Sequence, residues 1–153
     1  MDDVTFRQAT AADLPALLKL LADDDIAQAR GSYSAAVTTE VAAAFAEIER
    51  DSNNELWLGE RAGEIVAMLQ FTLIPGLSRS GMRRALVESV RVRADLRSRG
   101  IGAALMAHAE RRARAAGCGL IQLTTDKQRL AAHRFYERIG YAPSHLGMKK
   151  TLA

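Results

Sequence analysis

The sequence predicts a single-domain α/β protein with a mixed, largely antiparallel β-sheet flanked by about four helices. Strand-like runs alternate with amphipathic helical runs in the order β-α-α-β-β-β-α-β-α-β, with a second short strand possible at the end. A chain of 153 residues buries about two-thirds of its unfolded surface as one domain. No repeat, low-complexity tract or linker divides it, so residues 1–153 are expected to form one domain.

Two amphipathic helices are expected to follow a short strand at residues 4–9. Thr10 and Asp13 form a weak capping box that opens the first helix. One apolar face of that helix carries Leu14, Leu17, Leu18 and Leu21. A second helix repeats this spacing with Val41, Ala44, Phe45 and Ile48.

The remaining elements follow from alternating apolar residues and from glycine and proline. Strands are expected at residues 55–60, 64–74, 85–92 and 119–125, with a hairpin turn at residues 61–63. Helices are expected at residues 100–116 and 129–139, followed by one or two short strands at the C-terminus. Helix crossovers make parallel neighbours, whereas the central hairpins are antiparallel.

The composition fits an ordinary globular protein, with 48% hydrophobic and 25% charged residues. The net charge is +3, but arginines are interspersed with acidic residues over most of the chain, which argues against a nucleic-acid-binding tail. Basic residues are in local excess at 79–84 and 91–99, where an anionic ligand would be attracted.

The sequence predicts neither a secreted nor a membrane-spanning protein, and it predicts no metal site. The N-terminus lacks the pattern of a signal peptide, and no run approaches the roughly 18 apolar residues of a membrane span, so a cytoplasmic protein is expected. Cys118 is the only cysteine and is expected in the core. His108 and His145 lack neighbours at metal-ligand spacing, and His133 is expected to be exposed on its helix.

Gly100 and Gly102 stand where the helix at residues 100–116 begins. Glycine inside a helix costs roughly 0.5–1 kcal/mol relative to alanine, and no Ser, Thr, Asp or Asn caps this first turn. An uncapped helix N-terminus binds anions through its free N–H groups. The spacing excludes a P-loop, which needs a lysine after the last glycine, and a Rossmann fingerprint, because Leu105 replaces the third glycine.

The stretch Arg97-Ser98-Arg99-Gly100-Ile101-Gly102 matches the pattern [Q/R]-x-x-G-x-[G/A]. It resembles the pyrophosphate-binding motif of the GNAT superfamily of N-acetyltransferases, which use acetyl-CoA. The surrounding residues 87–106 place strand, loop and helix as this family does, and residues 131–141 are similar to its downstream helix. The order of elements also agrees from residue 4 to the C-terminus.

The resemblance implies an acetyl-CoA site along the strand at residues 85–92 and the loop after it. Val90 and Val92 would offer main-chain groups to the pantetheine arm, and an N–H near Val90 would stabilise the oxyanion of the tetrahedral intermediate. The family splays this strand from the strand at residues 119–125 to admit the thioester. The pyrophosphate would be held by Arg97, Arg99, Gly100, Gly102 and Ala103.

The same resemblance assigns two catalytic side chains. Tyr136 matches the tyrosine that protonates the departing thiolate, and a core tyrosine is the alternative. Glu88 is the candidate base, against the alternative of an ordinary surface carboxylate. Arg129 replaces an asparagine that contacts the pantetheine in many relatives, which puts that contact in doubt and leaves Arg129 as a candidate for a coenzyme phosphate.

The expected reaction is acetyl transfer from acetyl-CoA to a primary amine, of a small molecule rather than a peptide, by direct attack in a ternary complex. Tyr33 and Arg79 are the candidates for the acceptor side. Residues 132–145 also resemble the C-terminal part of aminoalkylphosphonate acetyltransferases. The alternative function is a catalytically silent acyl-CoA sensor or interaction domain of the same fold. Members of this family often dimerise, so the resemblance implies a homodimer as one expectation.

Overall fold

The structure is a computed structural model that describes residues 3–29 and 35–153. The chain divides into two compact units, residues 1–122 and 123–153. That the two units belong to one domain stays a prediction. Within the described residues, no helix is both long and apolar enough to span a membrane.

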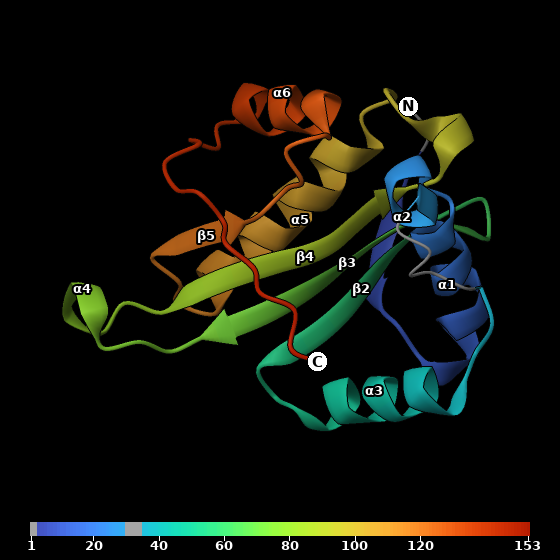
Figure 1. Cartoon of the computed structure of the whole chain (residues 1–153), viewed down its shortest axis with the longest axis horizontal. Helices are drawn as coiled ribbons and strands as arrows, with labels where there is room; N and C mark the ends of the chain where they lie inside the picture. Colours follow the sequence, from blue (N-terminus) through green and yellow to red (C-terminus); the bar gives the residue numbers. More distant parts are fainter. Residues whose placement is uncertain (1–2, 30–34) are drawn as a thin grey trace. The chain divides into compact units, whose positions relative to one another are not determined.

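A five-stranded sheet forms the centre of the first unit, with the strands in sequence order (Figure 1). The strands are β1 (Thr5–Gln8), β2 (Asn54–Arg61), β3 (Glu64–Ile74), β4 (Arg84–Val92) and β5 (Leu120–Leu123). The first four pair in antiparallel fashion. The predicted α/β class with a largely antiparallel sheet is therefore confirmed.

The four predicted helices are present, together with two short ones. Those predicted are α1 (Leu14–Ala22), α3 (Thr39–Arg50), α5 (Ile101–Ala115) and, in the second unit, α6 (Leu130–Arg138). The additional helices α2 (Asp25–Ala29) and α4 (Ser78–Gly81) are too short to show a helical repeat of apolar residues. In α4, Arg79 and Ser80 have positive φ angles, so this turn at the tip of the β3–β4 hairpin is left-handed.

The two faces of β3 meet different helices, because alternate side chains of a strand point to opposite sides. Met68 packs with Leu58 of β2 and with Leu17 and Leu20 of α1. On the opposite face, Phe71 lies under the guanidinium of Arg112 of α5. We call these the α1 face and the α5 face of the sheet.

The α5 face also holds a buried carboxylate. Glu55 is buried, and it accepts hydrogen bonds from Arg112 Nε (2.9 and 3.0 Å) and from Trp57 Nε1 (2.7 Å). A buried charge is tolerated when it is paired and hydrogen-bonded in this way. This ion pair fixes α5 against β2.

The turn between β2 and β3 is confirmed as a hairpin turn. Ala62 and Gly63 have φ angles of 50° and 78°. Two successive positive φ angles match the twist of the flanking strands.

The predicted strands at the C-terminus are wrong, because residues 141–153 are described without any strand. Pro143 lacks an N–H donor there, and the recorded backbone hydrogen bonds are local ones, such as Ser144 N–H to Ala142 C=O.

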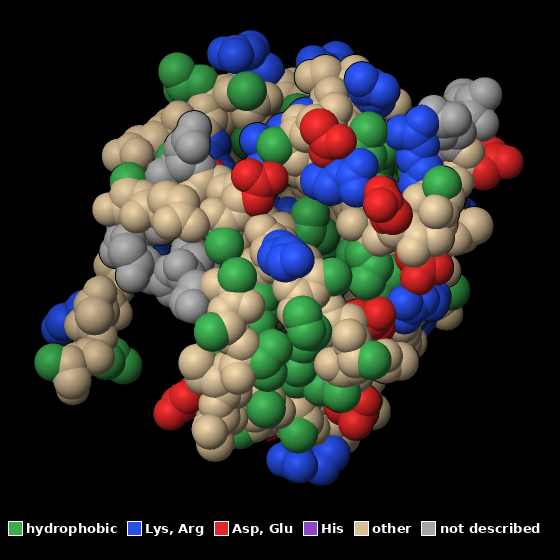
Figure 2. Space-filling model, turned by 90° about the vertical axis from the view of Figure 1, so that its right-hand side faces the viewer, with side chains coloured by type: hydrophobic (Ala, Val, Ile, Leu, Met, Phe, Trp, Pro, Cys, Tyr) green, Lys and Arg blue, Asp and Glu red, His purple; other side chains and the backbone are tan. Residues whose placement is uncertain are grey.

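Charges of both signs are mixed on the surface. On the face drawn in Figure 2, Lys and Arg side chains alternate with Asp and Glu side chains. The net charge of +3 is therefore not gathered into one patch on this face.

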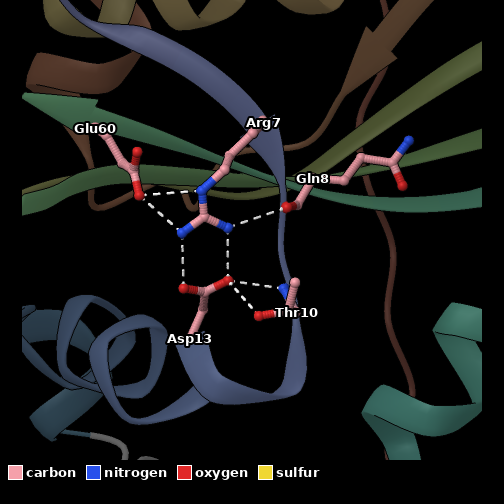
Figure 3. Close-up of polar contacts among 5 residues, drawn as sticks. All are labelled: Arg7, Gln8, Thr10, Asp13 and Glu60. Carbon is pink, nitrogen blue, oxygen red and sulfur yellow. Dashed lines mark hydrogen bonds and ion pairs between the residues drawn. The ribbon is translucent and has the colours of Figure 1, made fainter. Parts of the chain in front are cut away.

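The start of the first helical segment is tied to the sheet by an arginine (Figure 3). Arg7 of β1 donates to both oxygens of Asp13 (2.8 and 2.9 Å) and to Glu60 of β2 (3.0 and 2.7 Å). The N–H of Thr10 donates to Asp13 as well (2.7 Å), as the predicted capping box requires. These hydrogen bonds, that from Arg7 first, lower the pKa of Asp13 to about 2 despite its burial.

Asp13→Asn is expected to lower the free energy of unfolding at neutral pH and to make it depend less on pH below pH 4. The pKa of Asp13 is lower in the folded chain than in the unfolded chain, so its contribution is present above pH 4 and is lost as the pH falls towards 2. We expect a loss of roughly 1–2 kcal/mol at pH 7, measured by urea unfolding.

Asp95→Asn is the matched control, because Asp95 also pairs with an arginine but is exposed. Its substitution should change stability by less than about 0.5 kcal/mol. Equal losses for the two variants, or an Asp13→Asn loss that persists at pH 2, would contradict a special role for the Arg7 and Asp13 pair.

Candidate functional site

A β-bulge interrupts β4 beside its centre. Glu88 pairs with Gln70 of β3 and Arg91 pairs with Met68, so two residues of β4, Ser89 and Val90, stand opposite one residue of β3. Ser89 has a φ angle of 53°, in the left-handed region that a non-glycine residue rarely adopts. Bulges of this kind bend a strand, and they are frequent next to active sites.

The end of β4 extends beyond β5. The two strands begin side by side, since Gly119 N–H donates to Arg83 C=O (2.9 Å) and Arg84 Nη1 donates to Gln122 Oε1 (3.3 Å). Strand β5 has four residues and β4 has nine, so the part of β4 after the bulge has no partner in β5. The splaying of this strand pair, which the family resemblance implies, stays a prediction.

The main-chain groups of Val90 and Val92 lie in this part of β4, which pairs with β3 but not with β5. Arg93 N–H donates to Val66 C=O of β3 (2.8 Å), so the carbonyl of the same peptide, that of Val92, points away from β3. That carbonyl accepts from Arg97 Nε (3.2 Å), and the carbonyl of Val90 accepts from Arg91 Nη1 (2.9 Å). Arginine side chains therefore occupy both carbonyls in this structure.

The loop from β4 to α5 presents an uncapped helix N-terminus. A short 3₁₀ turn, η2 (Ala94–Leu96), anchors the loop through the buried side chain of Leu96. Gly100 then adopts a φ angle of 85°, and no side chain caps the first turn of α5. The N–H groups of Ile101, Gly102 and Ala103 precede the first residue that can donate within the helix, Ala104, which bonds to Gly100 C=O (3.0 Å).

The two arginines of this loop differ in their surroundings. Arg97 donates through Nη2 to Asp23 C=O (3.0 Å) at the end of α1, in addition to its bond to Val92. Arg99 is exposed, and its charge contributes to the lowered pKa of Asp95, after the hydrogen bond from Arg93. An anion at the start of α5 would thus meet an exposed arginine and a row of N–H groups.

Glu88 lies on the α1 face, at the edge of a polar region that crosses three strands. Its side chain is exposed, and its cross-strand neighbour is Gln70. Gln70 Nε2 donates to Asn54 Oδ1 (3.3 Å), which also accepts from Thr72 Oγ1 (2.8 Å). A hollow of about 220 Å³ adjoins this region and is lined by Ala44, Glu47, Ile48, Asp51, Asn54 and Gln70. The sequence predicted Glu88 but missed this hollow, which forms only when α3 packs over β2.

The second unit holds Arg129 and Tyr136. Arg129 is the residue before α6 and makes no side-chain capping hydrogen bond; its N–H donates to Asp126 C=O (2.9 Å). Tyr136 is half-buried between Phe135 and Tyr141, with ring centroids 5.1 and 5.8 Å away. Their roles stay predictions.

His133 departs from the expectation of an exposed helix residue. It is half-buried, and its Nε2 lies 2.9 Å from Asp126 C=O. The bond joins α6 to the segment before it, which fixes this side chain in a structural contact within the second unit.

Within the first unit, the structure does not bring Arg79 to the start of α5. Arg79 is exposed in α4, before the first residue of β4, whereas Gly100 follows the last. A nine-residue strand of about 3.3 Å per residue lies between these two ends. Tyr33, the other acceptor candidate, lies outside the described residues.

The remaining titratable candidates lie in structural contacts. His108 packs on Phe6 and Trp57, with ring centroids 4.9 and 4.4 Å away, and burial lowers its pKa. Burial raises the pKa of Cys118, although Arg83 and Arg112 oppose this shift. No group of three His, Cys, Asp or Glu side chains within the described part of the chain is arranged to hold a metal ion.

Comparisons with known proteins define the class of protein. A family profile described as Acetyltransferase (GNAT) family matches residues 16–141. The aminoalkylphosphonate N-acetyltransferase of Salmonella typhimurium strain LT2 is 38% identical over 108 residues, which cover 71% of this chain and 70% of that protein. This chain belongs to the GNAT family and is an N-acetyltransferase.

Solved structures share the fold of this chain. A crystal structure named as a transcriptional regulator from Bacillus halodurans C-125 has a TM-score of 0.92 and 45% identity, and covers 98% of this chain and 100% of its own. An aminoglycoside N-acetyltransferase in complex with CoA has a TM-score of 0.78 over 99% of this chain and 96% of its own. Its identity of 14% supports the fold alone.

Proposed function

We propose that this chain transfers an acetyl group from acetyl-CoA to the primary amine of a small molecule, by direct attack in a ternary complex. The observation that carries the proposal is that the uncapped α5 N-terminus follows, after one short loop, the bulged end of β4 that lacks a partner in β5. The end of β4 supplies a row of main-chain groups, and the N-terminus of α5 supplies an anion site further along the chain.

The residues fit the coenzyme in three respects. Gly100 has open space where a side chain would stand, so a pyrophosphate can approach the backbone of Gly102 and Ala103. Arg99 and Arg97 would supply positive charge beside it. The backbone of Val90 and Val92 would align the pantetheine arm, provided that the arginines that now bind their carbonyls shift or that their N–H groups are used.

The chemistry needs two proton movements and one stabilised oxyanion. Glu88 would accept a proton from the ammonium of the acceptor, directly or through water. Tyr136 would donate a proton to the departing thiolate, and Arg129 would contact the coenzyme. The N–H near Val90 would stabilise the negative charge that develops on the thioester oxygen.

A small cationic amine is the acceptor class that the first unit supports. The hollow beside Gln70 is lined by Glu47 and Asp51, whose carboxylates attract an ammonium group. The Salmonella relative is named for aminoalkylphosphonates, which carry a primary amine as well as an anionic group. Tyr33 and Arg79 stay candidates for the rest of the acceptor, and Arg79 would require an acceptor that reaches α4.

A catalytically silent acyl-CoA sensor is the alternative to turnover. It conflicts with the assignment as an N-acetyltransferase, although one relative of 45% identity is named as a transcriptional regulator. A thiol-release assay over a panel of amines separates the two functions, because a sensor would bind acetyl-CoA and release no thiol with any amine.

Gly102→Trp is expected to abolish binding of acetyl-CoA. An indole at the second residue of α5 would fill the space that a pyrophosphate needs beside the helix N–H groups. Isothermal titration of acetyl-CoA into both proteins measures the effect, and we expect at least a 30-fold rise in Kd.

Ala104→Trp adds the same indole at an exposed position of the same helix and controls for its bulk. Its Kd should stay within threefold of the wild type. Wild-type affinity in Gly102→Trp would rule out the pyrophosphate site.

Glu88→Gln is expected to lower kcat/KM by about 10²-fold or more near pH 7, since a positioned base contributes about 10²–10⁴-fold. The thiol-release assay with the best amine of the panel measures this effect. Glu49→Gln, which removes an exposed carboxylate of α3, should leave the rate within twofold. A Glu88→Gln enzyme that matches this control would remove Glu88 from the mechanism.

A further inference from the structure

We propose that Arg91 is a positioning residue of the acyl-transfer site, which holds the bulge of β4 and ties it to the connection between α1 and α2. The inference rests on the proposed function, and it concerns a residue that neither the motif nor the family resemblance singles out. Arg91 acts through the peptide groups of the bulge and does not itself contact the reacting atoms.

The side chain of Arg91 contacts both the bulge and the segment after α1. Its Nη1 donates to the carbonyl of Val90 (2.9 Å), and its Nη2 lies 3.4 Å from Asp24 Oδ2. The extra residue of a bulge is left out of the ladder of strand hydrogen bonds, so the bulge needs another donor to hold its orientation. The guanidinium of Arg91 supplies this donor.

The contact with Asp24 is shielded from water. The side chain of Arg91 is 15% exposed and that of Asp24 is 10% exposed. A pair at this depth is weakly screened by salt, and removal of one partner would leave the other charge buried. The planar guanidinium can bind a carbonyl and a carboxylate together, which the single ammonium of lysine cannot do in the same geometry.

Arg97, which follows η2, makes a similar pair of contacts. It joins the carbonyl of Val92 to the carbonyl of Asp23, as Arg91 joins the carbonyl of Val90 to the carboxylate of Asp24. Two consecutive residues that follow α1 are therefore linked, through these two arginines, to the two β4 carbonyls that the pantetheine arm would pass. A shift of the α1–α2 connection would be transmitted to the bulge through Arg91.

The experiment compares Arg91→Met and Arg91→Lys with a matched control, Arg84→Met. Arg84 is a half-buried arginine of the same strand whose Nη1 also makes a hydrogen bond, but it lies before the bulge. The double variant Arg91→Met/Asp24→Asn removes the buried charge of Asp24 and keeps the test valid if the single variant fails to fold. Thermal unfolding identifies the temperature at which all proteins are folded.

Two readouts are collected at that temperature. For turnover, we expect the folded Arg91→Met protein, single or double, to lose at least tenfold in kcat while KM for acetyl-CoA stays within threefold, and Arg91→Lys to recover part of kcat. Arg84→Met should keep kcat within twofold. Wild-type kcat in the Arg91 variants, or a loss shared by Arg84→Met, would overturn the proposal.

The second readout is amide hydrogen exchange at residues 88–92 and 22–26, without ligand. We expect the Arg91→Met variants to exchange at least tenfold faster in both segments than Arg84→Met does. If the wild type releases no thiol with any amine, the proposed function fails, and exchange alone then decides about Arg91. Unchanged exchange in both segments would overturn its positioning role.

Discussion

The bulge in β4 is the constraint on which the first unit's arrangement depends. Glu88 and Arg91 are three residues apart, so a regular strand would direct their side chains to opposite faces. The extra residue at Ser89 and Val90 restores the alternation, and Glu88 and Arg91 both stand opposite α1-face residues of β3, Gln70 and Met68. Without it, every side chain after Glu88 would change face.

The bulge also determines what the end of β4 can offer. Because β5 stops early, the backbone after the bulge has no partner in β5, and its carbonyls at Val90 and Val92 accept from arginine side chains. The chain then turns through η2 and enters α5 without a side-chain cap. The main-chain groups of β4 are thus followed along the chain by the N-terminus of α5, where the helix dipole is positive. This order suits a long ligand with an anionic group at one end.

Local sequence signals predicted much of the fold and pointed to the loop before α5 as a candidate site. The Thr10 and Asp13 capping box and the turn at Ala62 and Gly63 each depend on a few neighbouring residues. Glycine at the start of α5 could likewise be recognised from the sequence as a mark of close approach to the backbone.

The features that sequence could not supply depend on distant parts of the chain. The bulge at Ser89 has no glycine to mark it, and it arises from the register with β3. Asp24 meets Arg91 only after the sheet has brought α1 beside β4, and no local pattern encodes that contact. The C-terminal residues alternate apolar and polar like a strand, but Leu146 and Met148 are exposed and the segment forms none.

The most direct test of the α5 N-terminus as the ligand's anion site is amide hydrogen exchange at residues 97–103, with and without acetyl-CoA. Bound pyrophosphate would satisfy the N–H groups that no side chain caps, so exchange at Gly102 and Ala103 should slow at least tenfold at saturating acetyl-CoA. Unchanged exchange at these residues, in protein that calorimetry shows to be saturated, would contradict this role of the helix.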